Sequence, residues 1–118
     1  METIQMKIND LNSLAVQGRG LEAFDKYYDD DVIMQENENT PTVGKANNLK
    51  REKAFFEEFE EFNMIGPLKV AVGENVSMVE WHYKFIHKKN GPGEWTQVSV
   101  QEWKEGKIIK EKFYYNSK

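Results

Sequence analysis

The sequence predicts one α+β domain over residues 1–118, with three helices placed early and most of an antiparallel sheet after them. Two observations predict this class. Apolar residues recur at a helical spacing up to about residue 63, and at a spacing of about two from residue 67 onward. Short runs rich in glycine and asparagine then divide the second half into segments of strand length. Since helical and extended segments do not alternate regularly, an all-parallel sheet is not expected.

The first two helices are predicted by apolar stripes separated by glycines. One face of the first helix is formed by Ile4, Ile8, Leu11 and Ala15. Gly18 and Gly20 interrupt the pattern. A short second helix then has a stripe formed by Leu21, Phe24 and Tyr28. It is expected to end at the acidic turn Asp29–Asp31, so that the two helices form a hairpin.

A short strand and a longer third helix follow. Val32–Glu36 is rich in β-branched and apolar residues, as a strand should be, and the polar loop Asn37–Pro41 comes after it. The third helix is expected over Lys45–Asn63. Its apolar stripe is formed by Phe55, Phe59 and Phe62.

Four more strands are expected in the second half, joined by tight turns. Their ranges are Pro67–Val72, Val76–His87, Trp95–Lys104 and Lys107–Tyr115. The turns are Gly73–Asn75, Lys89–Gly93 and Glu105–Gly106. One face of the long second strand is expected to meet the helices with the row Val79, Trp81, Tyr83 and Phe85.

The two-residue turn at Glu105–Gly106 predicts a register for the last two strands, because residues opposite each other share a face. Counting outward from the turn, Glu102 should face Ile109. The more apolar face, which should meet the helices, then carries Val98, Val100, Glu102, Ile109, Glu111, Phe113 and Tyr115. Two carboxylates are therefore expected among core residues, where an unpaired charge is costly.

The other face of these two strands mixes aromatic and polar side chains, as protein contacts do. It is expected to carry Gln97, Ser99, Gln101, Trp103, Ile108, Lys110, Lys112 and Tyr114, beside Met78. We therefore predict a homodimer formed through the outer face of the sheet.

The composition limits the classes of partner and the cellular compartment that can be expected. The net charge of -4, without a basic cluster, argues against a nucleic-acid partner. The absence of cysteine excludes disulfides, thiolate catalysis and Cys-ligated zinc, and fits a reducing compartment. Glu2 stands where a signal peptide would carry positive charge, and no apolar run approaches the roughly 18 residues of a membrane span. We expect a cytoplasmic protein with no membrane partner.

No metal site is predicted from the two histidines. His82 and His87 are five residues apart on one strand, so their side chains point to opposite faces and cannot bind one ion together. Both are expected to be surface or interface residues.

Two sets of segments, one in each half of the chain, carry a family resemblance. The first set is Leu21–Phe24, Tyr28, Asp30–Val32, Met34–Asn37 and Val43–Ala46. The second set is Trp95–Val98, Gln101–Trp103, Glu105–Ile108 and Phe113–Tyr115. In this order they resemble the SnoaL-like group of the nuclear transport factor 2-like superfamily. The resemblance implies a cone-shaped, strongly curved sheet wrapped around three N-terminal helices, a pocket for a small, largely apolar ligand, and usually a dimer.

The same resemblance implies a range of activities, because the superfamily hosts isomerases, dehydratases, cyclases, epoxide hydrolases and non-catalytic binders. Aligned on the ketosteroid isomerase branch, Glu36 falls on the proton-shuttling carboxylate. The helix position of that branch's polarising tyrosine falls on Asn12, and an inward position that is apolar there is Glu111. Two carboxylates are therefore expected in one pocket.

Such a pair suggests proton-transfer chemistry. In an apolar cavity, burial and mutual repulsion should raise the pKa values of Glu36 and Glu111, so that one is an acid while the other is a base. The hypothesis is enolisation, dehydration or ring closure of a small apolar carbonyl compound, with no cofactor. The side chains expected to bind the ligand are Tyr28, Met34, Phe55, Phe59, Trp81, Tyr83, Val98, Val100 and Phe113.

Other interpretations stay open at this stage. Glu36 can lie exposed at the end of its strand, and Glu111 can pair with a lysine such as Lys53. The pocket can serve binding without catalysis, or it can be filled by side chains of the protein itself. The side chains that would fill it are Trp81, Phe55 and Phe113.

Overall fold

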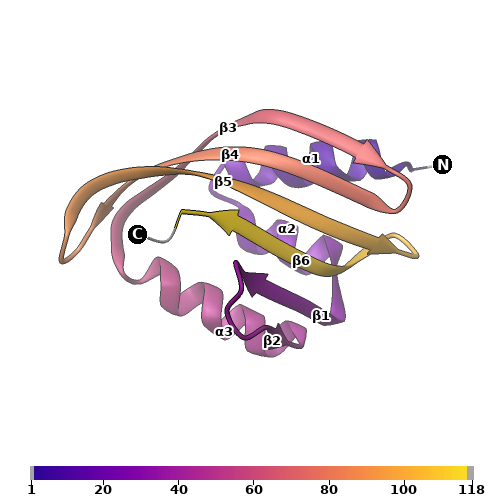
Figure 1. Cartoon of the computed structure of the whole chain (residues 1–118), viewed down its shortest axis with the longest axis horizontal. Helices are drawn as coiled ribbons and strands as arrows, with labels where there is room; N and C mark the ends of the chain where they lie inside the picture. Colours follow the sequence, from indigo (N-terminus) through magenta and orange to yellow (C-terminus); the bar gives the residue numbers. More distant parts are fainter. Residues whose placement is uncertain (1, 117–118) are drawn as a thin grey trace.

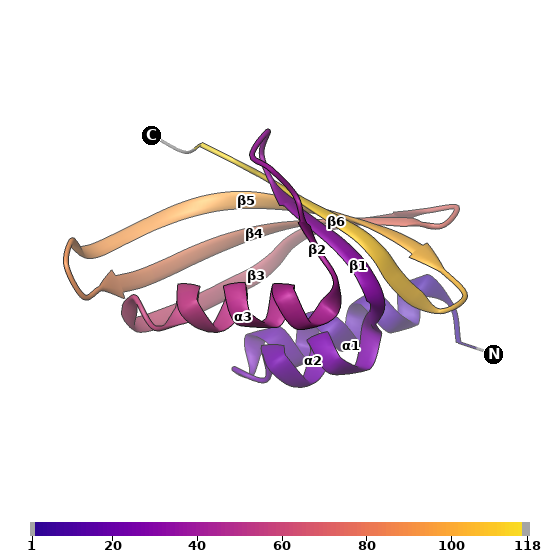
Figure 2. The same cartoon turned by 90° about the horizontal axis from the view of Figure 1, so that it is seen from below.

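The computed structural model describes residues 2–116 and shows a curved sheet with three helices on one of its faces (Figures 1 and 2). The helices are α1 (Ile4–Val16), α2 (Gly20–Tyr27) and α3 (Lys45–Phe56). The strands are β1 (Tyr28–Glu36), β2 (Thr42–Val43), β3 (Phe59–Gly73), β4 (Val76–His87), β5 (Gly91–Lys104) and β6 (Lys107–Tyr115). The predicted α+β class is confirmed. Within residues 2–116, none of the helices is both long and apolar enough to cross a membrane.

The sheet has six strands in the order β2-β1-β6-β5-β4-β3 and is open, with β2 and β3 at its edges. From β3 to β6 it is the expected antiparallel meander. The pair β1–β6 is parallel, so the prediction of a purely antiparallel sheet is wrong at this position. Five elements separate the two strands along the chain, so no tight turn imposes an antiparallel arrangement on them.

The helix expected over Lys45–Asn63 is shorter than predicted. It ends at Phe56, and the chain continues as β3. The phenylalanines of this segment fit either period, so pairing with β4 decides between them. The backbone N–H of Lys88 donates to the carbonyl of Glu58 at 2.9 Å, and Phe62 lies opposite Phe85. The gain from adding a strand to the sheet thus overrides the local helical pattern.

The β5–β6 hairpin has the predicted turn, but its register changes two residues beyond it. The two pairs nearest the turn lie as expected. Glu102 then lies opposite Lys110, which leaves Ile109 as an extra residue, a β-bulge. Side chains alternate between the two faces of a strand, so one extra residue in β6 changes which residues share a face. Beyond the bulge, the side chains of β5 lie on the opposite face from the one predicted, whereas those of β6 lie on the predicted face.

As a result three polar side chains of β5 face the helices, and two of its valines face outward. The side chains that were expected outside and are buried instead are Gln97, Ser99, Gln101, Trp103 and Ile108. Those expected inside that face outward instead are Val98, Val100 and Glu102. Trp103 shows why the bulge is favourable, since it buries its ring against Tyr27 of α2, with ring centroids 6.1 Å apart.

The core lies between the helices and the inner face of the sheet. The predicted inward row of β4 is part of it, with Val79, Trp81 and Tyr83 all buried. α1 begins at a capping residue, Thr3, whose hydroxyl accepts the Met6 N–H at 3.2 Å. This packing leaves a hollow between α2, α3 and the sheet.

Candidate functional site

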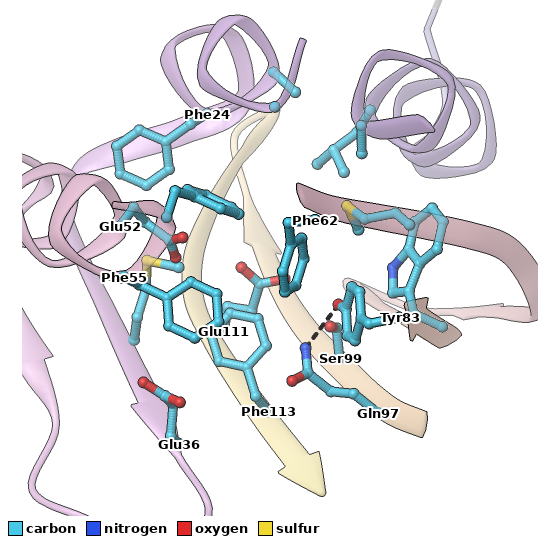
Figure 3. Close-up of a pocket in the computed structure, with 18 of the residues that line it drawn as sticks. Phe24, Glu36, Glu52, Phe55, Phe62, Tyr83, Gln97, Ser99, Glu111 and Phe113 are labelled. Atoms are coloured by element: carbon cyan, nitrogen blue, oxygen red, sulfur yellow. Dashed lines mark hydrogen bonds between the residues drawn. The ribbon is translucent and has the colours of Figure 1, made fainter. Parts of the chain in front are cut away.

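A cavity of about 190 Å³ lies between the helices and the inner face of the sheet (Figure 3). Ten of the residues in its wall are aromatic, namely Phe24, Tyr28, Phe55, Phe56, Phe62, Trp81, Tyr83, Trp95, Phe113 and Tyr115. Its charged residues are Glu36, Arg51, Glu52 and Glu111. The structure therefore places both predicted carboxylates, Glu36 and Glu111, on the wall of one cavity, as Figure 3 shows.

The predicted ligand-binding side chains divide into two groups. Those that line the cavity are Tyr28, Met34, Phe55, Trp81, Tyr83 and Phe113. Phe59 does not line it and packs instead on Phe62 and Phe85, with ring centroids 5.0 and 5.2 Å away. Val98 and Val100 do not line it either, because the bulge turns them to the outer face. The aromatic side chains that were considered as a filling form the wall of the cavity.

Glu111, at the centre of β6, is the most deeply placed acid of the cavity, with 3% of the residue exposed. The hydroxyl of Tyr28 donates to its Oε1. The side-chain amide of Gln101 donates to its Oε2 at 2.8 Å. The alternative partner, Lys53, is exposed, and Glu111 is satisfied by these two neutral donors.

A chain of buried side chains continues behind Gln101. The indole N–H of Trp103 donates to Ser77 Oγ at 2.8 Å, and Ser77 Oγ donates to Gln101 Oε1 at 2.7 Å. Ser77 and Gln101 are essentially inaccessible to solvent. The β-bulge is the origin of this chain, because it turns Gln101 and Trp103 inward.

The surroundings of Glu111 raise the pKa of its carboxyl group to near neutral pH. Burial raises the pKa of Glu111 to about 7, against the hydrogen bonds from Tyr28 and Gln101 that favour the carboxylate. The nearby carboxylate of Glu52 raises the pKa of Glu111 further. The expected source of this repulsion was Glu36, whereas the like charge with the largest effect is that of Glu52. Burial, and then the charge of Glu111, hold the pKa of Tyr28 well above its usual value.

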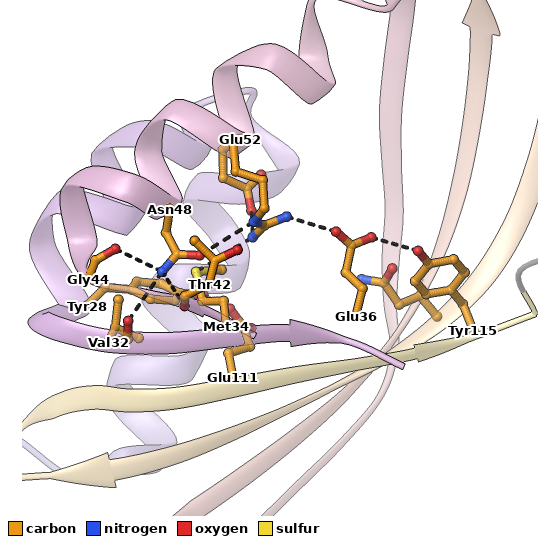
Figure 4. Close-up of polar contacts among 12 residues, drawn as sticks. Tyr28, Val32, Met34, Glu36, Thr42, Gly44, Asn48, Glu52, Glu111 and Tyr115 are labelled. Atoms are coloured by element: carbon orange, nitrogen blue, oxygen red, sulfur yellow. Dashed lines mark hydrogen bonds and ion pairs between the residues drawn. The ribbon is translucent and has the colours of Figure 1, made fainter. Parts of the chain in front are cut away.

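Glu36, at the end of β1, lies in a different environment, with 32% of its side chain exposed. Its Oε2 accepts from Arg51 at 3.0 Å, and its Oε1 accepts from the Tyr115 hydroxyl at 2.6 Å (Figure 4). Burial and the bond to Glu36 raise the pKa of Tyr115 to about 12. Arg51 also contacts Glu52 at 3.1 Å, which links the two carboxylates through one guanidinium.

Asn48 positions this charged group. Its side-chain amide donates to three backbone carbonyls, those of Val32, Thr42 and Gly44, at 3.2, 3.1 and 2.9 Å (Figure 4). These bonds tie the first turn of α3 to β1 and β2. Its carbonyl oxygen also faces Arg51 Nε at 3.4 Å. The buried amide thus holds α3 in the position from which Arg51 reaches Glu36.

Sequence reasoning missed the polar residues that complete the cavity. They are Arg51, Glu52, Gln97, Ser99, Gln101 and Tyr115. A signal for Glu52 exists, because Asn48, Glu52 and Phe55 follow one face of α3 at helical spacing. No comparable signal marks the β5 residues, since their orientation depends on the bulge.

The histidines lie apart from the cavity. His82 lies 3.4 Å from the Thr96 hydroxyl, and His87 accepts the backbone N–H groups of Lys89 and Asn90 at 3.1 and 3.2 Å. Among residues 2–116, no group of three or more His, Asp or Glu side chains is arranged to hold a metal ion.

Comparison with known proteins agrees with this architecture. The sequence model of a family described as SnoaL-like domain matches residues 10–111. No curated protein matches this chain.

Several solved structures have the same fold. One is a protein from Mesorhizobium loti named as a SnoaL-like polyketide cyclase, with a TM-score of 0.83 at 25% identity, covering 97% of this chain and 100% of that one. An NTF2-like protein of unknown function from Burkholderia pseudomallei has a TM-score of 0.85 at 10% identity, with 98% and 92% covered. A protein with a ketosteroid isomerase-like fold from Catenulispora acidiphila, solved with trimethylamine, has a TM-score of 0.78 at 10% identity, with 94% and 85% covered.

Proposed function

This chain belongs to the SnoaL-like domain family, and we propose that it is a proton-transfer enzyme, an isomerase, cyclase or dehydratase, acting on a small, largely apolar carbonyl compound. One observation carries the proposal. Two carboxyl groups in different environments line one apolar cavity, Glu111 buried and Glu36 ion-paired and partly exposed. Pairs of acids whose surroundings separate their properties are the usual basis of acid–base catalysis at neutral pH.

The roles follow from the surroundings. Glu36 forms an ion pair with Arg51 and keeps lone pairs beyond those used by Arg51 and Tyr115, so it can take a proton from a carbon next to the carbonyl. The electrons of the C–H bond form a C=C bond, and negative charge moves to the carbonyl oxygen. Glu111, with a pKa of about 7, is a proton reservoir for that oxygen. Return of a proton from Glu36 to another carbon completes an isomerisation.

The proposal is tested by following exchange of the α-protons of cyclohexanone in D₂O by NMR. We expect the protein to speed exchange over buffer, and Glu36→Gln to lower that gain by about 100-fold or more. A matched control is Glu38→Gln, since Glu38 is an exposed glutamate that pairs with Lys112 at 2.9 Å outside the cavity. Exchange at the buffer rate, or undiminished exchange in Glu36→Gln, would refute catalysis by Glu36.

A second candidate function is binding without catalysis. It is favoured by the contacts of Glu36, because both of its oxygens are already engaged by Arg51 and Tyr115. A binding protein needs no base free to move a proton. Saturable binding of cyclohexanone without any exchange would support this candidate over the first.

We also propose that the protein forms a homodimer through the outer face of the sheet. The prediction of which side chains make this contact is partly wrong, since Trp103 and Ile108 are buried inside the protein. The outer face instead carries Val98 and Val100 of β5, flanked by Met78, which is 45% exposed. An apolar strip of this kind fits the core of a protein contact. Light scattering at micromolar concentration should give twice the monomer mass, and a monomer mass would refute the dimer.

A further inference from the structure

The direction of every hydrogen bond in the buried chain behind Glu111 is determined by its first member. The indole N–H of Trp103 can only donate, so Ser77 Oγ accepts from it. The hydroxyl proton of Ser77 is then directed to Gln101 Oε1, at 2.7 Å. This leaves the NH₂ group of Gln101 facing Glu111 Oε2, at 2.8 Å. The chain therefore always presents a donor to that oxygen.

A proton on Glu111 is consequently restricted to one position. On Oε2 it would face the NH₂ of Gln101, donor against donor. Rotating the Gln101 amide would remove the clash, but it would leave the hydroxyl proton of Ser77 without its acceptor in a site closed to water. The proton of the neutral acid therefore lies on Oε1, where the Tyr28 hydroxyl lies.

Protonation of Glu111 must then reverse its bond with Tyr28. When Glu111 is a carboxylate, Tyr28 donates to Oε1. When Glu111 is neutral, Oε1–H donates to the tyrosine oxygen, and the tyrosine's own O–H has to turn away. The ring itself is held by stacking on Phe24, with centroids 4.8 Å apart, so only the hydroxyl hydrogen is free to turn. Tyr28 lines the cavity, so the released donor is available to a ligand there.

We infer that Tyr28 is a catalytic residue, whose hydroxyl donates a hydrogen bond to the carbonyl oxygen of the bound ligand when Glu111 is protonated. This inference rests on the proposed function and adds to it the group that contacts the developing oxyanion. Trp103, Ser77 and Gln101 are positioning residues, which act through Glu111. The ligand class is a neutral compound with an accepting oxygen, because the hydroxyl of Tyr28 offers that oxygen a donor only while Glu111 is neutral.

The proton movements balance along this path. As Glu36 removes a proton from the ligand carbon, the carbonyl oxygen gains charge and takes the hydrogen of Tyr28. The tyrosine oxygen takes the proton of Glu111, which becomes a carboxylate held by Gln101. Reversal of the same steps restores the ketone. No oxidant, reductant or further reactant is needed.

Other ionisable groups around this pair are on two further elements. α3 contributes Arg51 and Glu52, and β4 contributes Tyr83. The charge of Glu52 also acts on Tyr28, so it favours the neutral form of both members of the pair. Burial holds the pKa of Tyr83 far above neutral pH, so its hydroxyl stays protonated and accepts from Gln97 at 2.9 Å.

The test is the carbonyl stretching frequency of protein-bound cyclohexanone, measured by infrared difference spectroscopy below and above the pKa of Glu111. We expect a shift to lower frequency below that pKa and its loss above it. Tyr28→Phe should abolish the shift and weaken binding about tenfold, the effect of one lost hydrogen bond of about 1.4 kcal/mol. An unshifted carbonyl in the unmodified protein at low pH, or a shift that survives Tyr28→Phe, would overturn the inference.

Glu111→Gln is the most informative variant, since glutamine mimics the neutral acid. Its oxygen accepts from Gln101 and its NH₂ donates to Tyr28, so the carbonyl shift should persist at every pH. A hydroxyl outside the cavity gives the control. Ser77→Ala frees the Gln101 amide to rotate and should weaken the shift, whereas Thr96→Ala, at an exposed position of β5, should not. Equal shifts in the two variants would overturn the role of the chain.

The ligand-free protein offers a second measurement. With ¹³C-labelled tyrosine and glutamate, the Cζ signal of Tyr28 should titrate with the same midpoint as the Cδ signal of Glu111. An unchanged Tyr28 signal across that titration would contradict the inference even in the absence of a ligand. Failure of the proposed function is distinguishable, because it removes α-proton exchange and leaves these spectroscopic signals in place.

Discussion

Replacing Glu111 by glutamine should change how the stability of the protein depends on pH. Its pKa of about 7 compares with an ordinary value of 4.5, a difference of about 2.5. Each pKa unit corresponds to about 1.4 kcal/mol, so the full effect is about 3 kcal/mol. Since the folded state favours the neutral acid, it binds more protons than the unfolded chain between these two values. The free energy of unfolding should therefore fall as the pH rises from about 4.5 to about 7. Below this window the stabilisation by the neutral acid is fully present, and above it that stabilisation is lost.

The assay is urea denaturation of the protein and of Glu111→Gln at pH values across this window. Other carboxylates contribute equally to both proteins, so the informative quantity is the difference between their unfolding free energies. It should change by about 3 kcal/mol in favour of the variant as the pH rises. Glu38→Gln is the control, since 88% of that side chain is exposed. A constant difference between protein and variant across the window would refute the burial and ionisation assigned to Glu111.

Three further predictions concern the bulge, α3 and the charge beside Glu111. Ile108→Ala should cost about 2–5 kcal/mol in urea denaturation because Ile108 is fully buried, and Ile109→Ala should cost clearly less; equal costs would contradict the bulge. Asn48→Ala removes the donor of three backbone bonds and should cost about 1–3 kcal/mol by the same assay, whereas a neutral effect would show that these carbonyls find other partners. Glu52→Gln removes a nearby negative charge and should lower the pKa of Glu111, as followed by ¹³C NMR; an unchanged midpoint would place Glu52 too far away to act.

Much of the fold could be predicted because it follows from local patterns. The ranges of β4 and β6 are as expected, since turns rich in glycine and asparagine bound each strand. The inward row of β4 is also as expected, because large apolar residues alternate there with polar ones. The family resemblance, carried by segments in both halves, is confirmed by the match over residues 10–111.

The errors have a common physical origin. The end of α3 and the face of β5 depend on pairing with residues distant in the chain, and one extra residue in a strand exchanges its two faces. Nothing in the sequence distinguishes Ile109 as the bulged residue, because Ile108 beside it is equally apolar. Local sequence patterns therefore could not predict that Gln97, Ser99 and Gln101 of β5 line the cavity.

The sequence by itself determined which side of β6 carries Glu111 and placed Glu36 at the end of its strand, because alternation along a strand is a local property. Only the tertiary structure decided which groups surround each acid. The partners of Glu111 come from residues 83 and 10 positions away, and those of Glu36 from residues 15 and 79 positions away. The ionisation of a carboxyl group depends on the water removed from it and on the donors brought to it, and folding alone sets both.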